Sequence, residues 1–186
     1  MRLVRSRHER LGRRRVRARL REKAARHRGR TRGHRYELTP PLPEAEIRAF
    51  EKEHGIRLPA AYRAFVATVG DGPAGPDYGL MPLVFPRPEA DDDWAVDGEW
   101  EDDRRPGRLA APFPLAAPRP GPFGGEAEEW TRGTLMLSEQ GCGMYSRLVL
   151  NGPYAGEVWW LEPDWGGFVP ESPDFRTWYT DWLEQL

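Results

Sequence analysis

The sequence LPAAYRAFVATVGDG, residues 58–72, decides the fold of this chain. Four of its apolar side chains follow the i, i+3, i+4, i+7 spacing of one helix face: Tyr62, Phe65, Val66 and Val69. Pro59 suits a first helical position, because a proline lacks the N–H group that is unpaired there. Gly70-Asp71-Gly72 stops the pattern. The stretch therefore predicts a short helix with one buried face.

A second helix is expected immediately before this one, over Glu44–His54. Ile47 and Phe50 are three positions apart and share a face, and two glutamates occupy the first turn, where negative charge favours the helix dipole. Gly55 can close the helix, because glycine adopts the left-handed conformation without steric cost. The two stretches together predict a pair of short helices.

Residues 172–186 predict a C-terminal helix, with Ser172 as its N-cap and Pro173 in its first turn. Its apolar side chains share one face: Phe175, Trp178, Tyr179, Trp182 and Leu186. This helical spacing favours packing in the core over a ligand-binding role for the aromatic stripe.

Three short apolar or β-branched runs precede this helix: Thr134–Leu137, Ser146–Leu150 and Glu157–Leu161. Glycine-containing turns at residues 141–143 and 151–153 separate the runs, as in an antiparallel meander.

Three of these stretches resemble motifs of the SUKH superfamily, which includes fungal cell-wall assembly regulators and many bacterial immunity proteins. Residues 58–66 resemble its leucine–proline, tyrosine and phenylalanine helix, and Gly70-Asp71-Gly72 follows at the expected place. Ser146–Trp159 resembles a sheet segment of the family, and Ser172–Leu186 resembles its closing helix. The resemblance covers residues 42–80 and 134–186 in the same order and spacing.

The resemblance implies an α+β fold with a mostly antiparallel sheet and helices packed on one side. It implies no catalytic constellation and no cofactor. Bacterial members commonly bind and neutralise a cognate polymorphic toxin, often a nuclease. The resemblance therefore implies that the partner of residues 36–186, the SUKH-like domain, is a protein.

The charge of the chain is divided unevenly. Residues 1–35 hold 16 basic residues and two acids, whereas the remainder holds 12 basic and 27 acidic residues. Residues 1–35 have few large apolar side chains, so we expect an arm that is disordered or transiently helical. The arm has three interpretations: it binds nucleic acid non-specifically through phosphates, folds back on the acidic body, or is an unselected extension.

An insertion is expected around residues 87–130, because residues 104–125 are rich in proline and glycine. Its acidic segment, residues 89–103, contains nine acids and no basic residue. One interpretation is a solvated loop, and the other is a surface that steers a basic partner and holds it with tryptophans. The candidate partner-binding residues are Asp91, Asp92, Asp93, Trp94, Glu99, Trp100, Glu101, Asp102 and Asp103.

Other classes of function find little support. No apolar run is long enough to cross a membrane, and no apolar region follows the basic N-terminus as in a secretory signal. Cys142 has no cysteine partner, which favours the cytoplasm and argues against a zinc site. Gly141-Cys142-Gly143 has no histidine nearby in sequence to activate the thiol, and the glycines near Asp71 lack the lysine of a phosphate-binding loop.

The leading hypothesis is a cytoplasmic, non-enzymatic immunity protein that binds a basic nuclease toxin and takes no metal, cofactor or small-molecule substrate. The first alternative is a regulatory adaptor of the same fold with another protein partner. The second is a nucleic-acid-associated protein that uses residues 1–35, although Tyr36, at the end of this stretch, is the only tyrosine, tryptophan or phenylalanine near enough to stack on a base.

Overall fold

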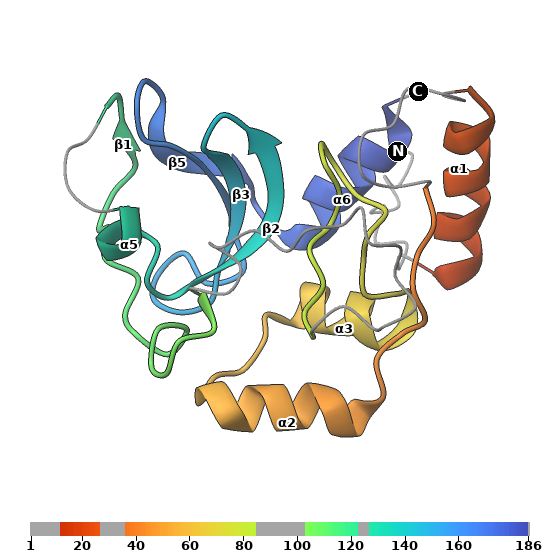
Figure 1. Ribbon diagram of the computed structural model, residues 1–186, viewed down its shortest axis with the longest axis horizontal. Helices are drawn as coiled ribbons and strands as arrows, with labels where there is room; N and C mark the ends of the chain where they lie inside the picture. Colours follow the sequence, from red (N-terminus) through yellow and green to blue (C-terminus); the bar gives the residue numbers. More distant parts are fainter. Residues whose placement is uncertain (1–11, 27–35, 85–102, 123–126, 186) are drawn as a thin grey trace, which may run out of the picture.

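The computed structural model describes residues 12–26, 36–84, 103–122 and 127–185. In these residues, a five-stranded antiparallel sheet lies beside a group of helices, and the chain is α+β as predicted (Figure 1). The strands, in the order β1-β5-β4-β3-β2 across the sheet, are β1 (Arg119–Pro120), β5 (Gly167–Ser172), β4 (Val158–Glu162), β3 (Met144–Val149) and β2 (Thr134–Gly141).

The three predicted strand runs are confirmed as β2, β3 and β4, although Leu150 lies just after β3 and Glu157 just before β4. Strand β5 was not predicted, and in it Pro170 stands opposite Trp159 of β4. In the sequence alone, Gly167 and Pro170 indicate a turn. In the structure, pairing with β4 keeps both residues in the strand. The free edge of β2 is covered, because the Met81 N–H donates to the Leu137 carbonyl at 2.7 Å.

The helices are α1 (Arg13–Arg26), α2 (Glu44–His54), α3 (Ala60–Thr68), α5 (Ala127–Trp130) and α6 (Phe175–Glu184). Gly55 ends α2 in the left-handed conformation, as predicted, with φ of 66°. The predicted N-cap of α6 is wrong: Asp174, not Ser172, accepts the Thr177 N–H at 2.7 Å. Ser172 still belongs to β5, so its backbone cannot begin the helix.

Helices α2, α3 and α6 lie on one side of the sheet, with α1 beyond α6 (Figure 1). The rings of Tyr62 and Phe65 pack against Phe175 at centroid distances of 4.9 and 5.1 Å. This cluster continues onto the sheet through Leu148 and Val158, neither of which is exposed. Each buried aromatic of α6 contributes about 1.5–3 kcal/mol by its apolar area. Of the stripe predicted in the last helix, Phe175, Trp178 and Tyr179 are therefore core and Trp182 is partly buried against them, while Leu186 lies outside the described residues.

The opposite face of the sheet has a core of its own. Phe113 packs edge-on against Trp159 and Phe168, with ring centroids 5.0 and 5.6 Å away. Residues 103–122, expected to be part of an insertion, run over this face, and the strand within them is β1. Phe113 and Leu115 are the side chains that dock them. Prolines prevent a helix here but leave the apolar side chains free to cover the sheet.

Helix α1 lies within the stretch expected to be disordered or transiently helical. Over residues 13–26 the structure instead has a helix docked on α6, with Val16, Leu20 and Lys23 buried. Three side chains spaced i, i+4, i+7 suffice to hold it, because α6 supplies the apolar partner that the segment lacks by itself.

Candidate binding surface

Of the residues predicted to bind a partner, those from Asp91 to Asp102 lie outside the described residues. Asp103 is described, and it does not belong to a surface: only 1% of it is exposed. Its carboxylate accepts the Met136 N–H at 2.8 Å and pairs with Arg147, which is itself fully buried. Asp103 cannot contact a partner, so its place in the predicted surface is corrected to a structural one.

The Arg147 guanidinium is held from a second direction. Its Nε donates to Thr134 Oγ1 at 2.8 Å, and that hydroxyl in turn donates to the Thr131 carbonyl at 2.6 Å. Burial raises the pKa of the Asp103 carboxyl, while Arg147 and the Met136 N–H act in the opposite direction. The network satisfies a buried charge pair on the sheet face that residues 103–122 cover.

Arg104 ties the chain after the acidic segment to the chain before it. Its Nη2 donates to the carbonyls of Pro82 and Leu83 at 3.0 and 3.1 Å. The Asp71 carboxylate accepts the N–H groups of Leu83 and Val84 at 2.7 and 3.3 Å. Burial lowers the pKa of the Arg104 guanidinium to about 10, against the opposing effect of Asp103. Both ends of the stretch between Val84 and Asp103 are therefore held at one place beside β2.

The turn between β4 and β5 presents a tryptophan to solvent. Trp165 is 82% exposed, whereas Glu162, just before the turn, is 5% exposed. The Glu162 carboxylate accepts the N–H groups of Asp164 at 3.2 Å, Trp165 at 2.8 Å and Gly166. Three backbone donors on one carboxylate hold the backbone of the turn, which projects the Trp165 side chain into solvent.

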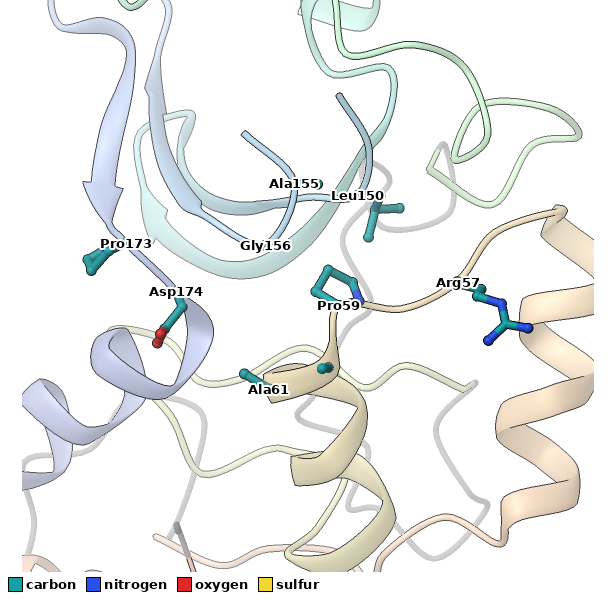
Figure 2. Close-up of a pocket in the computed structure, with 9 residues that line it drawn as sticks. Arg57, Pro59, Ala61, Leu150, Ala155, Gly156, Pro173 and Asp174 are labelled. Atoms are coloured by element: carbon teal, nitrogen blue, oxygen red, sulfur yellow. The ribbon is translucent and has the colours of Figure 1, made fainter. Parts of the chain in front are cut away.

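A groove of about 400 Å³ lies between α3, the β3–β4 connection and the start of α6 (Figure 2). Ala61 lines it from α3 and Pro59 from the position just before that helix, and Leu150 lines it from the β3–β4 connection; Arg57 and Asp174 lie at opposite ends (Figure 2). Its lining, as described, contains no Ser, Thr, Cys, His or Lys. The Asp174 carboxylate already caps α6. The groove is therefore suited to apolar contact and not to covalent chemistry.

Metal binding and membrane insertion find no support in the described part of the chain. Among its residues, no group of three or more His, Cys, Asp and Glu could hold a metal ion. No helix in the described ranges is long and apolar enough to cross a membrane. Cys142 is exposed at the tip of the β2–β3 turn with φ of 54°, in a left-handed turn conformation.

Sequence reasoning missed three of these features: the buried Arg147, the groove, and the exposed Trp165. A charged residue between Ser146 and Leu148 in β3 could not be assigned to the interior without its partner, Asp103, which is 44 positions away. The turn-forming residues on either side of Trp165, Asp164 and Gly166, could have indicated that this tryptophan is exposed.

Comparison with known proteins gives one finding. No curated protein and no solved structure matches the chain. Residues 41–181 match the SMI1 / KNR4 family (SUKH-1). This range contains α2, α3, α5, the whole sheet and the first seven residues of α6, and it excludes α1. Because the match spans well over half of the chain and agrees with the α+β fold, the chain belongs to the SMI1/KNR4 family (SUKH-1).

Proposed function

We propose that this chain is a non-enzymatic immunity protein that neutralises a cognate toxin by binding it. The SUKH-1 family is known for toxin-immunity proteins, which supports this class of function. The observation that carries the proposal is the fixing of Val84 and Asp103 beside β2. It closes a stretch with eight carboxylates and a single basic residue, Arg87; the ninth acid of the segment, Asp103, is itself buried.

The acidic stretch suits a basic partner. Clustered carboxylates speed the association of an oppositely charged protein and lose this effect in salt. Trp94 and Trp100 add apolar area to the stretch, and Trp165 offers an exposed indole on the body. Tryptophan is enriched among the residues that dominate binding energy. A nuclease toxin is basic where it holds phosphates, so it is the toxin class we propose, with the partner-binding residues between Asp91 and Asp102.

The direct test uses the toxin encoded beside this gene. We expect a toxin with a C-terminal nuclease domain directly upstream, a stable complex of the two purified proteins, and loss of nuclease activity at an equimolar ratio. A stable complex with a partner that has no toxic activity would favour the regulatory adaptor instead.

The acidic stretch is tested by charge reversal. The variant D91K/D92K/D93K should associate with the toxin at least about tenfold more slowly at low salt, with a weaker salt dependence, because steering is lost. The control E46K/E53K/D181K makes the same charge change at exposed positions on α2 and α6. Unchanged association kinetics in the first variant, or an equal effect in both, would contradict a role for the stretch.

A further inference from the structure

The orientation of α1 is set by one face. Val16, Leu20 and Lys23 are 0%, 3% and 4% exposed, and α1 packs beside α6 (Figure 1). Lys23 Nζ donates to the Gln185 carbonyl at the C-terminal end of α6 and lies 5.0 Å from the centre of the Trp182 ring. A cation is favoured there because the last carbonyls of a helix carry partial negative charge. The remaining faces of α1 are thereby directed outward.

The arginines of α1 fall on two flanks of this docked face. On one flank, Arg15 pairs with Glu184 at 3.2 Å and Arg19 pairs with Glu22 at 2.8 Å. The other flank carries a row spaced i, i+3, i+7, which we call the arginine row: Arg14, Arg17 and Arg21. No side chain in the described part of the protein forms an ion pair with any of these three.

The arginine row has the chemistry of a phosphate-binding surface. At 1.5 Å of rise per residue it is about 10 Å long, and a nucleic-acid duplex carries one negative charge per about 1.7 Å of its axis. Guanidinium groups bind phosphate oxygens through paired N–H donors. Between the arginines, this side of the helix carries the small side chains Ala18 and Ala25. It lacks the large apolar anchor of a protein interface and an aromatic ring to stack on bases.

We infer that the arginine row binds the phosphate backbone of nucleic acid without reading its sequence. Helix α1 holds eight basic residues and one acid, whereas residues 36–186 hold an excess of acids. Nucleic acid is repelled by the acidic body and attracted to the basic N-terminal stretch that contains α1, so the arginine row lies on the side of the protein where contact is favoured. This inference concerns a surface outside the family match and does not depend on toxin binding.

The test compares two double variants of the full chain. R17Q/R21Q removes two charges from the arginine row, and R15Q/R19Q removes two charges, also four positions apart, from the paired flank. Binding to a labelled 20-base-pair DNA and to a single-stranded RNA is measured by fluorescence anisotropy from 50 to 300 mM salt. We expect R17Q/R21Q to bind about tenfold more weakly at the lowest salt. Its log–log salt slope should be smaller by about 2, because each arginine removed leaves one phosphate without its neutralising charge.

The control variant should bind within about threefold of the wild type, since Arg15 and Arg19 are already engaged with carboxylates. Equal weakening in both variants would overturn the inference, because binding would then reflect total charge and not the row. Absence of binding by the wild type at 50 mM salt would also overturn it, as would binding of polyglutamate but not of nucleic acid. Unchanged hydrogen exchange of α1 in both variants verifies that the helix stays docked.

Discussion

Asp103 and Arg147 form an ion pair in the interior of the protein, with side-chain exposures of 2% and 0%. The pair joins the end of the acidic segment to the middle of β3. Removing one partner from such a pair leaves the other as an uncompensated buried charge, and this is more costly than losing both. The ion pair therefore connects the acidic segment, which lies between the stretches that resemble the family motifs, to the central sheet.

The first prediction concerns this pair. D103N and R147M should each lower the free energy of unfolding by about 3–5 kcal/mol, and the double variant should lose clearly less than the sum. Urea denaturation of the four proteins measures the coupling. The control R48M breaks the exposed pair with Glu44 and should cost at most about 0.5 kcal/mol. Additive single effects would show that the two groups do not stabilise each other.

The docking of α1 is tested at Leu20. L20A removes a side chain that is 3% exposed, which corresponds to about 2–5 kcal/mol of packing. This exceeds what a 14-residue helix holds alone, so amides of residues 13–26 should exchange much faster while those of β3 and β4 stay protected. Hydrogen-exchange mass spectrometry measures both. R14A, at an exposed position, should leave the exchange of α1 nearly unchanged; an equal effect would mean that α1 is not held by this face.

His54 predicts a dependence of stability on pH. Burial next to Phe50, whose ring centroid is 4.4 Å away, lowers the pKa of the imidazole below 6.5. Above this value His54 is neutral in both states and has no effect. Below it, the unfolded state takes up a proton first, so the contribution of His54 to stability falls as the pH drops towards the folded pKa.

The comparison for His54 is between the wild type and H54F. The wild type should lose more stability than H54F between pH 7.5 and pH 5, because phenylalanine cannot bind the proton. An NMR titration gives the pKa of His54 directly. A measured value above 6.5, or parallel stability profiles for the two proteins, would show that the imidazole is not disfavoured in its charged form.

Gly143 and Gly167 both have positive φ, so replacing each with alanine distinguishes the cost of backbone strain from the cost of steric crowding. A Cβ on Gly167 would lie 2.0 Å from the Arg119 carbonyl oxygen, whereas one on Gly143 would meet no atom within 4 Å. G143A should therefore cost only the left-handed conformation, about 1–2 kcal/mol. G167A should cost clearly more and separate β1 from β5, because the backbone of Arg119 must move. Thermal unfolding compares the two variants, and equal destabilisation would place Arg119 further from β5.

Much of the fold follows from local pattern. The helices at 44–54 and 60–68 and the aromatic face of α6 were predictable, because the spacing of apolar residues reports which face is buried whatever the partner is. The N-cap role of Asp174 was not predictable, because the position of the cap depends on where β5 ends. Strand β5 was not either, because Gly167 and Pro170 signal a turn until β4 pairs with them.

By itself, the sequence determined the α+β class, the family and the division of charge between the N-terminal stretch and the body. Only the tertiary structure decided the role of individual charges. It buried Asp103 against Arg147, docked α1 through Val16 and Leu20, and left Trp165 in solvent. The physical reason is that a side chain's environment depends on residues distant in sequence. In the sequence, a carboxylate in an exposed loop cannot be distinguished from one in a buried ion pair. For Asp103 the distinction depends on its partner Arg147, which is 44 positions away.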